Sequence, residues 1–206
     1  MKNEYDNILN SERTVEVNFI SEMYFKYIFN ECKILDVGGI PSKESDNLMI
    51  YQTLDSLKEK KYVYDISDFR GGKYKGDFVT LNIPEKYDII TFLSSLEHFP
   101  QCTEGDMKFR KNEDKLGFQK AIQLLNENGK IILTVPFGKP VWQPYHQNYD
   151  IKLINDISSG THIIEQYIYV LKNNKWILIE DLSTTENILY TDKAYCVGCF
   201  VFEKNK

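Results

Sequence analysis

The chain has 206 residues, of which 42% are hydrophobic and 27% charged, and a formal net charge of −5 at pH 7. This length predicts one domain with its own core, and the composition is that of an ordinary globular protein. The acidic balance disfavours a broad nucleic-acid footprint, since phosphate binding needs a basic surface. No apolar stretch reaches the ~20 residues that cross a bilayer, and no secretory pattern opens the chain, so we expect no membrane association and a cytoplasmic location.

The first two thirds of the chain alternate between helical and extended patterns. Apolar residues at helical spacing predict helices over 11–31, 41–57 and 118–125, the last stopped by Gly129. The polar segment 101–115 is expected to be a loop. Short apolar runs predict strands over 33–38, 61–65, 78–81, 87–93 and 131–135. Strands that alternate with helices indicate βαβ units and a parallel sheet.

The last third of the chain is richer in strands. Residues 162–171 and 176–180 read as a β-hairpin joined by Lys172-Asn-Asn-Lys175, and 196–203 as a final strand. Cys196 and Cys199 lie in that strand, on opposite faces, and are expected to be plain buried thiols rather than a metal or redox pair. The fold class we expect is α/β. It is a Rossmann-like, doubly wound, mostly parallel seven-stranded sheet with an antiparallel C-terminal strand and a β-hairpin insertion.

The turn that follows the first predicted strand is the most informative feature. Asp36 lies inside the apolar run, which ends in Gly38 and Gly39. Paired glycines let the backbone turn sharply and approach a ligand, and in parallel α/β sheets this first turn is where nucleotide-like ligands bind. A carboxylate beside such a turn suits amine or hydroxyl donors better than phosphates. The pattern therefore favours S-adenosylmethionine over a dinucleotide.

Several motifs in order make the chain similar to the class I S-adenosylmethionine-dependent methyltransferases over about 11–204. They are Ile34-Leu-Asp-Val-Gly-Gly39, Asp65 at the end of the second strand, Gly76-Asp77, Tyr87 to His98 ending in Leu-Glu-His, and Leu124 to Pro136 ending in Val-Pro. The chain departs from the family's Asp-x-Gly-x-Gly-x-Gly pattern, because Ile40 and Ser42 occupy the later glycine positions. The resemblance implies a single methyltransferase domain over 1–206. It consists of a helical lead-in (1–31), a cofactor-binding core (33–138) and an acceptor-side part (139–206).

The resemblance also implies roles for the cofactor-binding residues. Asp36, Gly38 and Gly39 would hold the methionine half of the cofactor, and Asp65 the ribose hydroxyls. The remaining residues implied to line the cofactor site are Asp77 and Phe78 at the adenine and Leu93 and Ser94 below the sulfonium. Two alternatives stay open. Asp68 competes with Asp65 for the ribose, and Asp77 can simply form a turn after Gly76.

Glu97, His98 and His146 are the candidate catalytic residues. Glu97 and His98 follow the fourth strand and His146 follows the fifth, so the topology brings them to one edge of the sheet, where a base is useful for a hydroxyl acceptor. The set is similar to the acid-histidine metal cluster of the ubiquinone-pathway O-methyltransferases, but Ser94 replaces its first Glu. A divalent metal is therefore open but not favoured. The alternative is that His98 only caps or packs, and His162 is expected to be structural.

The expected acceptor is a small molecule. Phe137, Trp142 and Tyr145 suggest an aromatic wall that stacks on a sugar or base, or else simple packing of the loop. The resemblance to chains of polysaccharide clusters favours O-methylation of a sugar, a nucleotide-sugar or a phosphorylated surface-polysaccharide precursor. The alternatives are a non-catalytic binding or assembly module of the same fold and, less favoured, an RNA 2′-O-methyltransferase. A homodimer is left open.

Overall fold

The computed structural model describes residues 11–39, 48–68, 71–99, 112–142, 147–190 and 194–205. Its centre is an eight-stranded sheet in the order β3-β2-β1-β4-β5-β10-β8-β9, beside a two-stranded sheet of β6 and β7. The strands are β1 (Lys33–Val37), β2 (Val63–Asp68), β3 (Tyr74–Lys75), β4 (Tyr87–Leu93), β5 (Leu125–Pro136), β6 (Val141–Trp142), β7 (Gln147–Asn148), β8 (Thr161–Lys172), β9 (Lys175–Ile179) and β10 (Cys196–Lys204).

Strands β3, β2, β1, β4 and β5 are parallel, whereas β10 is antiparallel to both β5 and β8. The strand order runs outward in two directions from β1, to β2 on one side and to β4 on the other. In open α/β sheets, ligands bind outside the carboxyl ends of the strands at such a switch point. The expected fold class is thus confirmed, with eight strands in the main sheet rather than seven.

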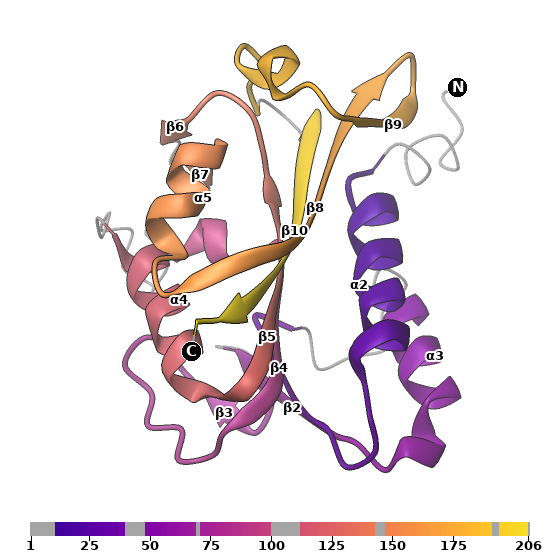
Figure 1. Ribbon diagram of the computed structural model, residues 1–206, viewed down its shortest axis with the longest axis vertical. Helices are drawn as coiled ribbons and strands as arrows, with labels where there is room; N and C mark the ends of the chain where they lie inside the picture. The colour runs from indigo at the N-terminus through magenta and orange to yellow at the C-terminus, as the bar shows by residue number, and fades with distance from the viewer. Residues whose placement is uncertain are drawn as a thin grey trace.

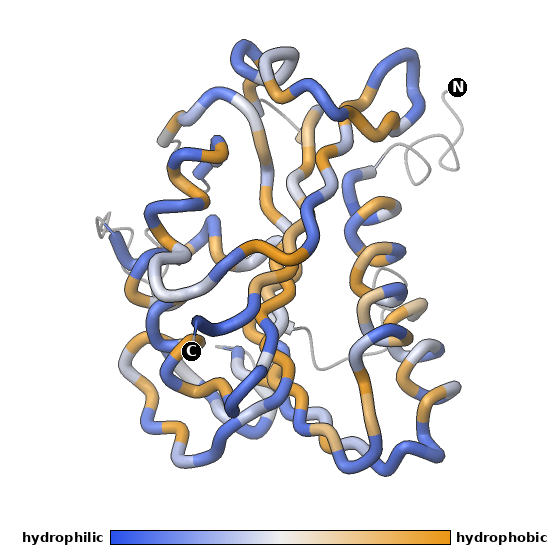
Figure 2. The backbone as a smooth tube through the Cα atoms, in the orientation of Figure 1, coloured by the Kyte–Doolittle hydropathy of each residue, from blue (hydrophilic) through white to orange (hydrophobic). Residues whose placement is uncertain are grey.

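Helices cover both faces of the sheet (Figure 1). Helices α2 (Arg13–Tyr27) and α3 (Leu48–Ser56) lie on one face, and α4 (Glu113–Leu124) and α5 (Ile151–Ile157) on the other. Each pair closes its own core, because parallel strands flanked by helices must be apolar on both faces. Figure 2 shows the resulting hydrophobic run through the middle of the sheet. At the centre of the α4 side, the rings of Phe92, Phe118 and Phe202 are fully buried.

Two segments on the β2 side of the sheet differ from the sequence-based expectation. Strand β2 does not end at Asp65 but continues to Asp68, because its last residues pair with both β1 and β3. The strand expected over 78–81 is a turn instead. The backbone N–H groups of Thr80 and Leu81 both donate to the carbonyl of Asp77, which closes the chain into a turn there.

The region around α4 also differs. The helix begins at Glu113, inside the segment expected to be a loop, while 100–111 lies outside the described residues. It ends at Leu124 because Leu125 adopts an extended backbone and its N–H caps the helix. The expected C-cap Gly129 therefore lies within β5, and Asn128 before it takes the positive φ of 61°.

The hairpin and the final strand are confirmed as β8, β9 and β10. Asn173 and Asn174 have φ values of 49° and 58°, as a two-residue hairpin turn of the favoured hand requires. Cys32, Cys196 and Cys199 are buried thiols, which confirms the expectation for the last two. Helix α5 was not predicted, although Asp150 supplied a signal: its carboxylate accepts a hydrogen bond from the N–H of Leu153, 2.7 Å away. None of the described helices is long and apolar enough to span a bilayer.

Candidate functional site

The turn after β1 is held tightly between the ends of two neighbouring strands. Gly38 has φ 82° and donates its N–H to the carbonyl of Ser67 at 2.8 Å. On the other side the hydroxyl of Ser95 donates to the carbonyl of Val37 at 2.6 Å. A Cβ on Gly38 would lie 2.5 Å from the Cβ of Ser95, and one on Gly39 would lie 2.5 Å from Oδ2 of Asp36. The two glycines are therefore required by the geometry of the turn itself.

Replacing Gly38 with alanine is expected to cost roughly 2–4 kcal/mol of unfolding free energy, from left-handed backbone strain plus the clash with Ser95. Gly160 is a matched control, since it has φ 95° but a Cβ there meets only Ile122, at 3.9 Å. Gly160→Ala should lose only the strain term, about 1–2 kcal/mol. Urea unfolding of both variants measures the difference. Equal losses would show that the approach of Ser95 to the turn is not tight in solution.

Asp36 is the acid beside that turn, and it is 5% exposed. The hydroxyl of Tyr64 donates to its Oδ2 at 2.5 Å. Its Oδ1 is buried and finds no hydrogen-bond partner within the described part of the chain. Burial raises the pKa of Asp36 to about 6, against the lowering effects of Tyr64 and Arg13. A buried carboxylate oxygen without a donor is costly, so a ligand that supplies an N–H or O–H there is favoured.

The two acids of β2 are used differently. Asp65 lies in the middle of the strand, where its Oδ2 is 2.8 Å from the ammonium of Lys73 and 2.8 Å from the hydroxyl of Tyr87. Asp68 ends the strand, is buried, and is close enough to Asp36 to raise the pKa of that carboxyl. The acid at the carboxyl edge of β2 is therefore Asp68, the competitor that the sequence left open, and Asp65 has structural partners.

Asp77 and Phe78 lie in the turn before β4. The carboxylate of Asp77 accepts a hydrogen bond from the N–H of Val79 at 3.0 Å, which is the turn-forming role. The ring of Phe78 is 4% exposed and packs edge-on against Phe92 and Phe99, with centroid distances of 5.9 and 6.0 Å. In this conformation the ring belongs to the core rather than to an open ligand surface.

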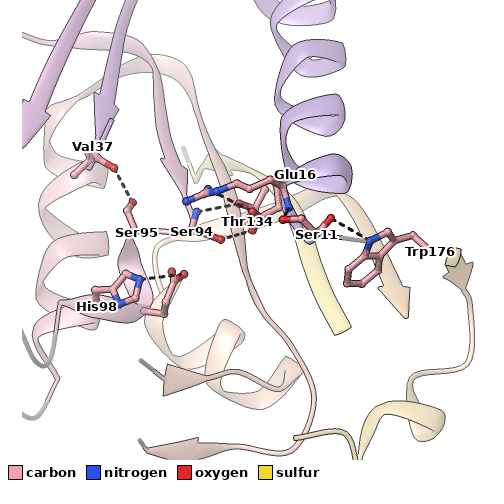
Figure 3. Close-up of polar contacts among 10 residues, drawn as sticks. Ser11, Glu16, Val37, Ser94, Ser95, His98, Thr134 and Trp176 are labelled. Carbon is pink, nitrogen blue, oxygen red and sulfur yellow. Dashed lines mark hydrogen bonds and ion pairs between the residues drawn. The ribbon is translucent and has the colours of Figure 1, made fainter. Parts of the chain in front are cut away.

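At the end of β4, Ser94 connects the sheet to helix α2. Leu93 before it is 8% exposed, and Ser94 itself has φ 40°. The N–H of Ser94 donates to the hydroxyl of Thr134 on β5 at 3.1 Å, and its hydroxyl donates to Glu16 (Figure 3). Ser94 thus fixes a glutamate from α2 over the carboxyl ends of β4 and β5.

Glu16 is the site residue that sequence reasoning missed. Its side chain is fully buried, and its second oxygen is 3.4 Å from the guanidinium of Arg13. Burial is the main cause that raises its pKa. The signal was its spacing, since Glu16 lies four residues before Ile20 and seven before Met23 and so shares the buried face of the helix. A carboxylate on an apolar helix face is a candidate functional residue.

Glu97 and His98 lie in the short helix η3 (Leu96–His98) that follows β4. Glu97 is 2% exposed and its Oε2 finds no hydrogen-bond partner among the described residues, while its Oε1 lies 3.8 Å from Nε2 of the half-exposed His98. Burial raises the pKa of Glu97 to about 7, helped by the negative charge of Glu16 and opposed by His98. The value places this carboxyl close to neutral pH, where a proton acceptor works best.

These side chains surround a pocket of about 80 Å³ at the carboxyl edge of β4 and β5, room for a small polar group. Its lining comes from α2, the end of β4, η3, the end of β5 and the segment before β10. The residues are Glu12, Arg13, Glu16, Ser94, Glu97, His98, Pro136, Tyr190 and Ala194. Glu97 and His98 of the expected catalytic set are thus brought together, with Glu16 added.

The other expected acceptor-side residues are not placed at this pocket. His146 and Tyr145 lie outside the described residues, and Phe137 is buried against Phe200. Within the described part of the chain no three His, Cys, Asp or Glu side chains are grouped to hold a metal ion. The metal alternative, which the sequence left open without favouring it, includes His146 and is not tested by the described residues. Nδ1 of His162 lies 3.0 Å from Oδ1 of Asn205, an exposed contact at the start of β8.

No protein-family model and no curated protein matches the chain. Solved structures do match it. The N-methyltransferase NodS from Bradyrhizobium japonicum WM9, in complex with S-adenosyl-L-homocysteine, has a TM-score of 0.57 at 9% identity, covering 95% of this chain and 88% of that one. A S-adenosylmethionine-dependent methyltransferase from Clostridium acetobutylicum ATCC 824 has a TM-score of 0.51 at 11% identity, covering 92% and 91%. The [4+2]-cyclase SpnF has 0.50 at 10%, covering 90% and 79%. At such identities the likeness shows the fold, which is the one that S-adenosylmethionine-dependent methyltransferases share.

Proposed function

We propose that this chain, which has the Rossmann-like fold of the class I methyltransferases, binds S-adenosylmethionine and transfers its methyl group to a small acceptor. The observation that carries the proposal is Asp36, a buried carboxylate with an unpartnered oxygen beside the glycine turn, at the switch point of the sheet. Carboxylate and turn together suit the ammonium of an amino-acid moiety, which supplies the missing donor and a positive charge.

The residues at this edge fit the cofactor's groups. Oδ1 of Asp36 would accept from the ammonium and the backbone of Gly38 and Gly39 would approach the methionine half. Asp68 would take the ribose hydroxyls, the part expected of Asp65. Leu93 and Ser94 would line the site below the sulfonium. Asp77 and Phe78 stay a prediction for the adenine end, since one now holds a turn and the other lies in the core.

When bound, the cofactor supplies a methyl group already activated by its sulfonium, so positioning of the acceptor is the protein's main task. The acceptor side of the proposal is the pocket of Glu16, Glu97 and His98, with His146 as a further candidate base. We propose O-methylation of a sugar, a nucleotide-sugar or a phosphorylated surface-polysaccharide precursor. The support for this acceptor class is that the short layout and the run Val135-Pro-Phe-Gly138 resemble those of chains from polysaccharide clusters, which is an association and not an observation at the site.

Isothermal titration calorimetry with S-adenosylmethionine and S-adenosylhomocysteine tests the cofactor. We expect saturable one-to-one binding of both, weakened by Asp36→Asn. Absence of binding at millimolar cofactor would overturn the proposal. A screen of nucleotide sugars with methyl-labelled cofactor then tests the acceptor. Binding of the cofactor without methyl transfer to any acceptor would favour the non-catalytic alternative. Loss of activity on adding EDTA would support a divalent metal in the site.

A further inference from the structure

Two buried carboxylates face the same small pocket, and they differ in how their oxygens are used. Glu16 accepts from Ser94 with one oxygen and lies 3.4 Å from Arg13 with the other, so its hydrogen-bonding capacity within the described structure is taken up at both oxygens. Glu97 has a buried Oε2 without a partner there. Glu97 lines the pocket, and an unpartnered buried carboxylate oxygen in such a residue favours a ligand that brings a hydrogen-bond donor.

The charges around Glu97 come from every element that packs on it. Helix α2 contributes Glu12, Arg13 and Glu16, η3 contributes His98, and Tyr149 lies close enough for Glu97 to affect its pKa. Tyr190 also lines the pocket. Burial has the largest effect on the pKa of Glu97 and raises it, His98 and Arg13 lower it, and the negative charge of Glu16 raises it further. The charges of α2 therefore adjust a proton affinity that burial has already raised.

We infer, given the proposed function, that Glu97 is the proton acceptor for a hydroxyl acceptor and that Glu16 is the positioning residue that keeps it basic. As the acceptor oxygen forms its bond to the methyl carbon, the O–H proton passes to Oε2 of Glu97, and the broken C–S bond leaves its electron pair on the sulfur. Glu16, held by Ser94 and Arg13, raises the proton affinity of Glu97 through its negative charge. The hydroxyl of the methyl acceptor binds in its neutral form, because the unpartnered Oε2 of Glu97 can accept one hydrogen bond from an O–H group.

Two cofactor analogues test this placement without a known acceptor. S-adenosylhomocysteine carries a neutral sulfur at the reacting position, and sinefungin carries a cationic amine there. If Glu97 faces that position, sinefungin should bind about tenfold or more tighter than S-adenosylhomocysteine at pH 8, because a charge-assisted hydrogen bond adds to its affinity. The preference should shrink below pH 7 as Glu97 takes up a proton. Calorimetry over pH 5.5–8.5 measures it.

Substitutions of Glu97 and Glu16 distinguish the roles of the two carboxylates. Glu97→Gln should reduce the preference to about threefold or less and leave the affinity for S-adenosylhomocysteine unchanged. Glu16→Gln should keep the preference but move its midpoint to lower pH, a shift that lost packing would not produce. Glu127→Gln, at the opposite edge of the sheet near Asp88, is the control that should match the wild type.

Each outcome decides between the claims. If S-adenosylhomocysteine does not bind the wild type, the proposed function fails. If it binds and sinefungin shows no preference, or if Glu97→Gln keeps the preference, the role of Glu97 is overturned while cofactor binding stands. With an acceptor from the nucleotide-sugar screen, Glu97→Gln should lower kcat by about 10²-fold or more at unchanged cofactor affinity. An N-methylated product would overturn the hydroxyl assignment.

Discussion

Replacing Glu97 with glutamine is expected to make the folded protein more stable at pH 8, by up to roughly 3 kcal/mol, and to leave its stability at pH 4 unchanged. The pKa of Glu97 is raised from 4.5 to about 7 in the folded state, and each unit is worth ~1.4 kcal/mol. Between these pH values the folded protein binds the proton and the unfolded chain has released it, so stability falls as pH rises through the window. Glutamine removes that penalty. Urea unfolding of both proteins at pH 4, 6 and 8 measures it.

Glu165→Gln supplies a control of opposite sign. Glu165 accepts from Lys26 at 2.8 Å and also from Tyr27 and Tyr167, contacts that hold its pKa below its ordinary value against the effect of burial. Its contribution is therefore present above the unfolded pKa and lost on acidification. The variant should be less stable than the wild type at pH 8 and converge with it at low pH. If Glu97→Gln also destabilised the protein at pH 8, Glu97 would not be an uncompensated buried carboxylate.

The strands that were predicted correctly from the sequence are those whose residue pattern has a single physical cause. The run Tyr87–Leu93 is apolar except at Asp88 and Thr91 because both of its faces are covered, and its predicted limits agree with the structure. The hairpin was readable because Asn173 and Asn174 suit a turn that requires positive φ. The turn at 78–81 was misread as a strand because Phe78 and Val79 look like strand residues. There the carboxylate and carbonyl of Asp77 organise the backbone.

The sequence predicted site residues only where functional side chains and a special backbone conformation occur in the same short segment. Gly38 and Asp36 form a local pattern, and the structure places them together at the switch point. That β2 ends at Asp68 rather than at Asp65 depends on its pairing with β3, which no local pattern specifies. Glu16 joins Glu97 only through the packing of α2 on the sheet, across about eighty residues of chain. Its long-range contact with Ser94 is a tertiary property.

Fold alone leaves the activity open, since the cyclase SpnF matches this chain about as well as the methyltransferase from Clostridium acetobutylicum does. Methyl transfer therefore depends on whether particular polar groups of this chain bind the cofactor and the acceptor. Asp36 is the most direct place to ask, because its buried oxygen lacks a donor within the described structure and because its charge depends on pH near neutrality.

The affinity for S-adenosylhomocysteine is expected to fall about tenfold between pH 7 and pH 5, since the pKa of Asp36 is about 6 and only its ionised form pairs with the ligand's ammonium. This ligand is chosen because its sulfur is neutral, so the protonation of Glu97 should not change its affinity over this pH range. Asp36→Asn should bind roughly thirtyfold more weakly at pH 7, from about 2 kcal/mol of lost charge-assisted hydrogen bonding, and show no change in this pH range. Calorimetry at half-unit steps of pH measures both.

Tyr64 fixes the midpoint of that titration. Its hydroxyl donates to Oδ2 of Asp36 and favours the ionised form, so Tyr64→Phe should raise the pKa of Asp36 and move the affinity midpoint to higher pH. Tyr62→Phe is the matched control, because the Tyr62 hydroxyl donates to the carbonyl of Leu54, 2.8 Å away. If the pH midpoint of the affinity moves in both variants, the cause is altered packing around β2 and not the hydrogen bond from Tyr64 to Asp36. If the pH midpoint moves only in Tyr64→Phe, the ligand's ammonium binds the carboxylate of Asp36 at the glycine turn.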